Sequence, residues 1–220
     1  MEIRVDFNEK ISNLNNEIIK MGVLVEEALD KSMDSLINMD LDLANKVIVE
    51  DENVNNMEVS IEDHCILLIA REQPVAGDLR NLITALKIST QLERMGDHAV
   101  HIAKGVIRLQ KDNQSGINPL YGMPEMGKLV KNMLQRVLSA YIECNVEEAR
   151  SIAINDNEVD RIHNEVITEV FENLMNTKSD QQKATTLLFI NRFLERFGDH
   201  ITNICEWIVY SVTGDHVELS

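Results

Sequence analysis

The stretch LERMGDH at residues 92–98 returns almost unchanged as LERFGDH at residues 194–200. The copies are 194 − 92 = 102 residues apart, and apolar positions on both sides recur at the same offset. These positions are Ile88, Leu92, Met95, Ala99, Ile102 and Val106 in the first copy, and Ile190, Leu194, Phe197, Ile201, Ile204 and Ile208 in the second. Steps of three and four residues place each set on one face of an α-helix. The repeat therefore predicts two equivalent amphipathic helices.

A second pair of segments repeats at a similar offset. DENVN at residues 51–55 corresponds to DNEVD at residues 156–160, which lies 156 − 51 = 105 residues later. The chain thus contains two copies of one three-helix unit, with helices predicted at residues 5–38, 42–71, 77–111, 122–145, 147–176 and 182–212. Short connections favour antiparallel neighbours. We predict an all-α fold of two tandem, internally duplicated antiparallel three-helix bundles, covering residues 1–113 and 118–220.

The breaks between the predicted helices have physical causes. Proline disfavours helical geometry in the residue before it, so Gln73-Pro74 should end the second helix. Asp40 and Asp180 stand where N-caps are needed. Residues 112–124 hold two of the three prolines and two glycines, so this segment is predicted to link the halves.

Composition and charge exclude several classes of protein. Aromatic residues make up 4% of the chain and there are three prolines, which is too few for the strands and turns of a β-sandwich. The net charge of -16 repels nucleic acid and anionic lipid alike. No apolar run approaches the roughly 20 residues of a membrane span, and MEIRVDFNEK at the start lacks the apolar core of a signal peptide. We therefore expect a cytoplasmic protein that binds no nucleic acid and does not insert into a membrane.

Acidic side chains repeat together with the helices. Glu93 and Asp97 are four residues apart and lie opposite the apolar stripe of their helix. Like charges at this spacing cost about 0.2–0.5 kcal/mol per pair, and the same cost in both halves requires an explanation. If the neighbouring helix carries its own pair alongside, four oxygen-bearing side chains converge in each half. The predicted metal ligands are Asp51, Asn55, Glu93, Asp97, Asp156, Asp160, Glu195 and Asp199.

Such oxygen donors suit magnesium, manganese or iron and accept zinc. Two other interpretations stay open: a solvated acidic face on an acidic protein, or charge neutralised by the adjacent Arg94 and Arg196. The cysteines form no Cys-x-x-Cys pair, so we expect Cys65, Cys144 and Cys205 to be buried thiols rather than ligands.

The chain resembles the PhoU family over nearly its whole length. The resemblance rests on LERMGDH and LERFGDH, on EDENVNNMEVSIED at residues 50–63 and DNEVDRIH at 156–163, on REQPVAGDLRNLITALK at 71–87, and on NICEWIVYSVTG at 203–214. It implies a cytoplasmic regulator of phosphate uptake, without enzymatic activity of its own. Such a regulator acts between the phosphate ABC transporter and the sensor histidine kinase of the phosphate regulon, and restrains both when phosphate is sufficient.

The resemblance also implies that the acidic pairs could hold a multinuclear cluster, of iron or zinc in preference to manganese or magnesium, and that the protein is a homodimer. In the first half one carboxylate is replaced by the amide of Asn55, so we expect the second half to bind metal more tightly.

The rival interpretation is a carboxylate-rich metal-binding protein with oxidase-like or phosphatase-like activity. A ferritin-like oxidase requires Glu-x-x-His on two helices, and no glutamate of the chain is followed three residues later by histidine. A metallophosphatase would use clustered metals to activate water, but the sequence contains no glycine-rich phosphate cradle. A helical spacer without any ligand is the third possibility.

Overall fold

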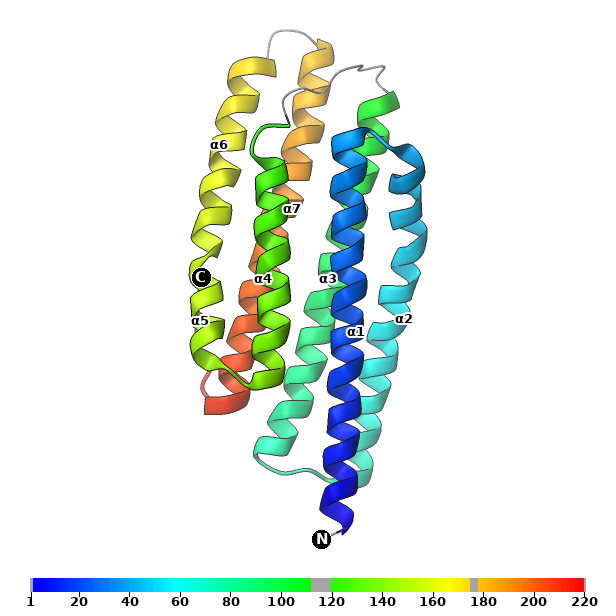
Figure 1. The fold of residues 1–220 in the computed structure, drawn as a ribbon, viewed down its shortest axis with the longest axis vertical. Coiled ribbons are helices and arrows are strands. Elements are labelled where there is room, and N and C mark those ends of the chain that lie inside the picture. The colour runs from blue at the N-terminus through cyan, green and yellow to red at the C-terminus, as the bar shows by residue number, and fades with distance from the viewer. Residues whose placement is uncertain (1, 112–119, 175–177, 220) are drawn as a thin grey trace.

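The structure, a computed structural model, describes residues 2–111, 120–174 and 178–219. Within these ranges the chain forms helices and no strands, which confirms the all-α prediction (Figure 1). The helices are α1 (Glu2–Asn38), α2 (Leu41–Glu72), α3 (Gly77–Lys111), α4 (Met123–Glu143), α5 (Val146–Ile154), α6 (Asp156–Leu174) and α7 (Lys178–Thr213). None of these described helices combines the length and the apolar character needed to cross a membrane.

The helices form two antiparallel bundles that lie side by side. Figure 1 shows α1, α2 and α3 in one bundle and α4 to α7 in the other, with the chain running in opposite directions in the two. The most extensive contact between any two helices joins α3 to α7, and α1 also packs on α4. The apolar stripes predicted on α3 and α7 are buried, and they belong to one continuous core. The two halves therefore pack on each other through their repeated helices.

The fifth predicted helix is interrupted at one residue, which separates α5 from α6. The backbone N–H of Asn155 donates to the carbonyl of Ile152, and the carbonyl of Asn155 accepts from the N–H of Glu158 at 3.0 Å. This tight turn leaves the carbonyl of Ile154 without its usual helical donor, and the side-chain amide of Asn157 bonds it at 3.0 Å. The interruption directly precedes the acidic segment of the second half.

The predicted helix ends are mostly confirmed. Gln73 follows α2 in the left-handed conformation (φ 47°, ψ 52°), and Asp40 caps α2 by accepting a hydrogen bond from the N–H of Leu43 at 3.0 Å. The prediction for Asp180 is wrong, because α7 begins two residues earlier, at Lys178. Residues 112–119 of the predicted linker lie outside the described residues, and Pro124 falls in the first turn of α4, where its missing N–H is tolerated.

One of the three cysteines departs from the expected burial. Cys65 and Cys205 are buried, whereas Cys144 is exposed. Cys144 ends α4 in the left-handed conformation (φ 52°), where the chain turns away from the core toward α5. The last buried residue of α4 is Ala140, so Cys144 lies one turn beyond the point at which the helix leaves the core.

Candidate functional site

Helices α2 and α3 bring the acidic side chains of the first half together. We define the first carboxylate cluster as Asp51 and Glu58 of α2 with Glu93 and Asp97 of α3; all four are half-buried. Burial, followed by the charges of Asp97 and Glu58, raises the pKa of Glu93 to about 7. Burial and the charge of Asp97 also raise the pKa of Asp51. These carboxylates are therefore close enough to repel one another in a partly dry setting.

The predicted ligand Asn55 lies at the exposed rim of the first cluster. Its side-chain amide donates a hydrogen bond to Oδ2 of Asp51 at 3.4 Å. The other oxygen of this carboxylate, Oδ1, is buried and has no hydrogen-bond partner among the described residues. The amide thus stabilises only one of the two oxygens of Asp51.

In the second half α6 and α7 form an equivalent group, the second carboxylate cluster, of Asp156, Asp160, Glu195 and Asp199. Asp156 is only 9% exposed. Burial, then the charges of Asp199 and Asp160, raises the pKa of Asp156 to about 7. Burial and the charge of Asp160 raise the pKa of Asp199 as well. At the position of Asn55 the second half has the carboxylate of Asp160, whereas at the position of Glu58 it has His163.

Glu195 is the member of the second cluster that contacts a cation. Its Oε1 accepts from Nη1 of Arg192 at 3.4 Å. Its Oε2 is buried and lacks a partner among the described residues. Burial and the charge of Asp199 raise the pKa of Glu195 despite this arginine. One ion pair therefore does not neutralise the cluster.

The glycine of each repeated segment makes room for the deepest carboxylate. A Cβ atom on Gly198 would lie 2.5 Å from Oδ1 of Asp156, and one on Gly96 would lie 3.2 Å from Oδ1 of Asp51. Alanine is the better helix former, yet any side chain here would displace the acid. The sequence analysis gave these glycines no role. The sequence did contain a usable signal for them, because both copies place a glycine inside a predicted helix, where glycine is unfavourable without a packing reason.

The eight predicted ligands lie in two groups, one in each half; in the first group Asn55 lies at the exposed rim and Glu58 is an additional member. Their oxygen donors, raised pKa values and unpartnered buried oxygens fit a hard cation in chemistry and in charge. Across the part of the chain that the structure describes, however, no three His, Cys, Asp or Glu side chains are arranged to hold a metal ion. The donors are thus adjacent without forming a ready coordination sphere.

The two motif arginines do not neutralise the clusters in this structure. Among the described residues, Arg94 and Arg196 form no ion pair with a cluster carboxylate. Both are exposed. Burial raises the pKa of Glu93, and the charge of Arg94 partly opposes this rise. The charge of Arg196 opposes the raised pKa of Asp199 in the same way, so the arginines offset part of the negative charge without direct contact.

The histidines that end the repeated segments contact each other between the two halves. Nδ1 of His200 lies 2.7 Å from Oε1 of Gln91, and its Nε2 lies 3.1 Å from Nε2 of His98. Because the Gln91 oxygen only accepts, His200 carries its proton on Nδ1 and His98 donates from Nε2. Nδ1 of His98 is then an acceptor, and it is buried without a partner among the described residues.

Both histidines are neutral at pH 7. Burial, followed by the charge of His200, lowers the pKa of His98 to about 3. Burial, followed by the charge of Arg94, lowers the pKa of His200 to about 4. The sequence analysis missed this pair, although a histidine at the same place in both copies was a usable signal.

Comparison with known proteins identifies relatives along the whole chain. The PhoU domain family matches residues 18–106 and 123–208, one match in each half. A phosphate-specific transport system accessory protein PhoU homolog of Clostridium acetobutylicum is 37% identical over 97% of both chains. The phosphate-specific transport system accessory protein PhoU of Escherichia coli (strain K12) is 35% identical, over 94% of this chain and 86% of its own.

Two solved structures share the fold. The phosphate transport system regulatory protein PhoU from Streptococcus pneumoniae superposes with a TM-score of 0.88 at 35% identity, over 97% of this chain and 100% of the other. PhoU from Pseudomonas aeruginosa gives a TM-score of 0.88 at 32% identity, over 95% of this chain and 100% of the other. With both halves matched and identity above 30% over almost the full length, the chain belongs to the PhoU family.

Proposed function

We propose that this protein regulates phosphate uptake as an adaptor between the phosphate ABC transporter and the sensor histidine kinase of the phosphate regulon. It acts as a negative regulator when phosphate is sufficient, and it has no enzymatic activity of its own. The observation that carries the proposal is the likeness over the full length to proteins named as accessory or regulatory components of phosphate transport. It acts in the cytoplasm, as a homodimer held at the membrane through protein partners.

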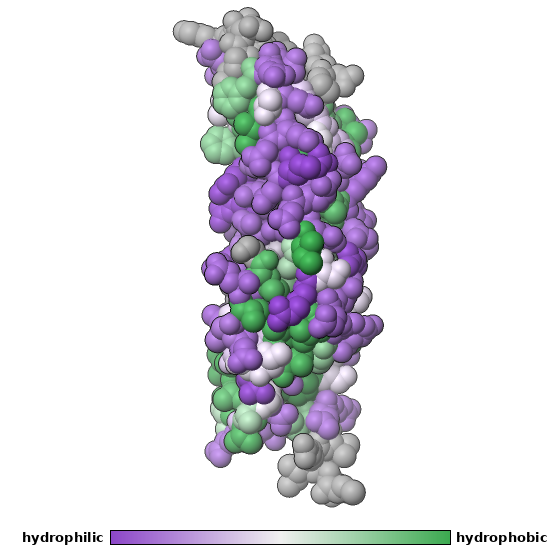
Figure 2. All heavy atoms as spheres, turned by 90° about the vertical axis from the view of Figure 1, so that its left-hand side faces the viewer, coloured by the Kyte–Doolittle hydropathy of each residue, from purple (hydrophilic) through white to green (hydrophobic). Residues whose placement is uncertain are grey.

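The surface supports docking to proteins rather than to lipid. The chain carries a net charge of -16, which opposes binding to anionic headgroups. Figure 2 shows apolar side chains gathered on the lower half of the face that carries α5, below a hydrophilic upper half. The exposed apolar residues of the elements at that end are Ile142, Ile154 and Val212. A surface area enriched in apolar side chains on an acidic protein is typical of a protein interface.

The experiment that tests this proposal is deletion of the gene in its host, with phosphate abundant. We expect phosphate-uptake genes to be derepressed, and the intact chain supplied in trans to restore repression. A chain carrying Ile154→Asp should restore it poorly, whereas Val49→Asp, at an exposed valine of the first half, should restore it fully. Uptake genes that stay repressed in the deletion strain would reject the regulatory role.

We also propose that the two carboxylate clusters bind iron or zinc as a structural or regulatory group. The support is the uncompensated, half-buried charge in each cluster. Because Asp160 replaces Asn55, the second cluster should bind more tightly. Elemental analysis after loading with iron, zinc or manganese tests this, with Asp156→Asn and Asp51→Asn as a matched pair. No bound metal under any loading condition would reject metal binding and leave the adaptor role intact.

The enzymatic alternative makes a different prediction. If the clusters carried out metal-assisted hydrolysis, the loaded protein would turn over phosphoryl substrates, and Asp97→Ala with Asp199→Ala would abolish the turnover. The names of the relatives favour the accessory role instead.

A further inference from the structure

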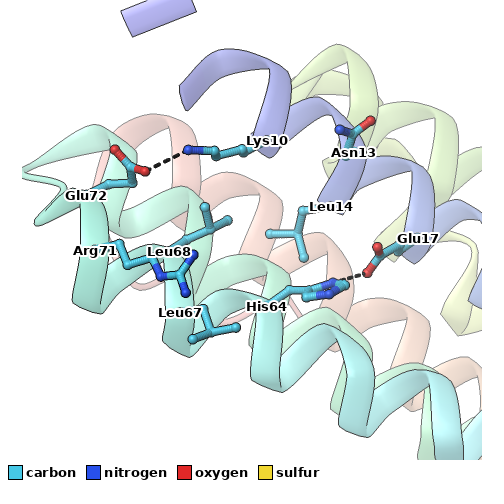
Figure 3. Close-up of a pocket in the computed structure, with 9 residues that line it drawn as sticks. All are labelled: Lys10, Asn13, Leu14, Glu17, His64, Leu67, Leu68, Arg71 and Glu72. Carbon is cyan, nitrogen blue, oxygen red and sulfur yellow. Dashed lines mark hydrogen bonds and ion pairs between the residues drawn. The ribbon is translucent and has the colours of Figure 1, made fainter. Parts of the chain in front are cut away.

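A groove between α1 and α2 of the first half lies apart from both carboxylate clusters. It has a volume of about 320 Å³, within the size range of small-molecule sites. Its floor is aliphatic and consists of Leu14, Leu67 and Leu68 (Figure 3). Leu67 is 47% exposed, and Leu14 is buried. The groove thus leaves an apolar surface open to solvent.

Contacts between polar side chains of α1 and α2 close the groove at both ends. Lys10 Nζ contacts Glu72 Oε1 at 2.8 Å at one end, and His64 Nδ1 contacts Glu17 Oε2 at 2.8 Å at the other (Figure 3). Lys10 and Glu17 are seven residues apart on α1, which corresponds to about 10 Å along the helix axis. A helix of a partner protein lying along the groove would be blocked by these contacts at its two ends. A bounded groove of this length fits a short molecule better.

Arg71 supplies the charge that the ligand must match. Its side chain lies beside Leu67 and Leu68 in Figure 3. The acids that line the groove are Glu17 and Glu72, and each already contacts another side chain, Glu17 that of His64 and Glu72 that of Lys10. Within the described part of the chain, no carboxylate forms an ion pair with Arg71. A guanidinium group beside an apolar floor is suited to bind a carboxylate through two parallel hydrogen bonds.

The second half provides an internal reference for this surface. At the offset of 105 residues, Leu67 corresponds to Glu172 and Leu68 to Asn173. Both counterparts are exposed on α6, and the apolar core of that helix is nevertheless complete. The fold therefore does not require leucines on the outer face of this helix. Single exposed leucines are common, but here they coincide with a bounded groove and with an arginine that forms no ion pair among the described residues.

We infer that this groove binds a small amphipathic carboxylate, whose aliphatic chain covers Leu14, Leu67 and Leu68 while its carboxylate pairs with Arg71. The floor contains no aromatic ring, so it suits a flexible aliphatic chain rather than a planar ring. The side-chain contacts at the two ends set an upper limit to the length of the ligand's aliphatic chain. The site lies outside the clusters and outside the face of Figure 2, so its failure would leave the proposed function untouched.

Calorimetric titration of the full chain with octanoate tests this inference. We expect saturable binding at one site, and weaker or undetectable binding of acetate, which lacks the chain, and of 1-octanol, which lacks the charge. Arg71→Gln should weaken octanoate binding at least about tenfold through loss of the charged pair. Leu67→Glu introduces the residue type that the second half has at this place, so it should fold normally and lose binding.

Two control variants change exposed positions outside the groove. Val59→Glu adds a charge to another exposed position of α2, and Arg108→Gln removes an exposed arginine of α3. Both should bind octanoate as the unmodified chain does. Absence of octanoate binding would overturn the inference, even if a leucine-rich acidic peptide bound instead. Equal binding by the Leu67→Glu and unmodified chains, or equal binding of octanol and octanoate, would overturn it as well.

Discussion

Asp156 packs against Gly198 with 9% of its surface exposed, and two further carboxylates, Asp160 and Asp199, lie within range of its charge. A carboxylate in this position loses hydration and gains repulsion when it ionises. The helix accepts an acid here only because residue 198 has no side chain. The missing Cβ of Gly198 thus leaves room for Asp156 in a buried position, and burial with the neighbouring charges raises the pKa of Asp156.

Gly198→Ala should destabilise the protein by about 1–3 kcal/mol, because the new Cβ would lie 2.5 Å from Oδ1 of Asp156. Gly96→Ala should destabilise the protein less, since its new Cβ would lie 3.2 Å from Oδ1 of Asp51. Urea unfolding measures both. Gly77→Ala is the control: nothing lies within 4 Å of its added Cβ, so the gain in helix propensity should leave it neutral or slightly stabilised. Equal losses at all three glycines would contradict the packing explanation.

Asp156→Asn should stabilise the metal-free protein at pH 8. The pKa of Asp156 is raised from 3.8 to about 7, so between these values the folded chain binds more protons than the unfolded chain. Stability from this group therefore falls as the pH rises toward 7. Above pH 7 the carboxylate of Asp156 is ionised in the folded chain and destabilises it fully. Removing this charge should therefore raise the free energy of unfolding by about 1–2 kcal/mol.

Urea unfolding at pH 8 and pH 5 with a chelator present tests this, and the gain should shrink at pH 5. Asp215→Asn, at an exposed position near the C-terminus, serves as the control and should change little at either pH. If Asp156→Asn instead lowered the stability at pH 8, favourable interactions of the ionised carboxylate would have to outweigh the cost of its burial.

The pairing of acids was predictable from the sequence, and their environment was not. Spacings of four residues place Glu93 with Asp97 on one helix face by helix geometry alone. The burial of Asp156 and the close approach of Gly198 depend on how α6 crosses α7, which brings together residues that are 198 − 156 = 42 positions apart. Local periodicity contains no information about that crossing.

At the scale of elements, α3 and α7 pack closely along their length. A Cβ on Gly105 would lie 2.7 Å from Cγ1 of Ile190, so the side chain of Ile190 on α7 packs directly against the backbone of α3 here. Toward the centre of the contact, His98 and His200 stack with ring centroids 5.1 Å apart. The two helices were predicted from their apolar stripes. Their packing on each other was not predicted, because each stripe had been assigned to the core of its own three-helix bundle.

Replacing His98 and His200 together with glutamine should make the protein less sensitive to acid. Their pKa values are lowered to about 3 and about 4, so below the ordinary value of 6.5 the unfolded chain binds more protons than the folded chain. Stability from this pair is therefore lost as the pH falls below about 6.5. The free energy of unfolding should decline less steeply between pH 6.5 and pH 4.5 in the double variant.

Equilibrium urea unfolding across this range gives the two slopes. Replacing the exposed His216 with glutamine provides the matched control, which should follow the unmodified protein. Parallel slopes for the double variant and the unmodified chain would show that the pair does not control acid stability.

At the scale of the whole molecule, the halves are related by an approximate two-fold axis near the histidine pair. His98 and His200 occupy equivalent positions, since 98 + 102 = 200, and they contact each other. The same relation holds further out. Thr84 Oγ1 lies 3.5 Å from the carbonyl of Trp207, and the equivalent residues, Thr186 and Gly105, also approach each other. The repeat predicted two similar halves, but it could not predict their relative orientation, because an offset in sequence has no direction in space.

Residues 1–111 produced alone should form a dimer. The face of α3 that packs on α7 is buried in the whole chain and would be exposed in an isolated half, while a second copy offers an equivalent face in the same orientation. Sedimentation equilibrium should therefore give twice the mass of the fragment. Gly105→Glu, which places a charge in this face, should prevent the association. A folded fragment that stays monomeric would contradict the symmetric packing.

When two equivalent units are joined in one chain, each unit can accumulate its own substitutions during evolution. In a dimer of identical subunits every substitution is carried twice, so a change that suits one side is imposed on the other. In a tandem chain the copies can diverge, as Asn55 and Asp160 have done, and as Leu67 and Glu172 have done on the outer faces. The histidine contact at the axis then retains the geometry of a symmetric pair, while the outer surfaces are free to acquire separate uses.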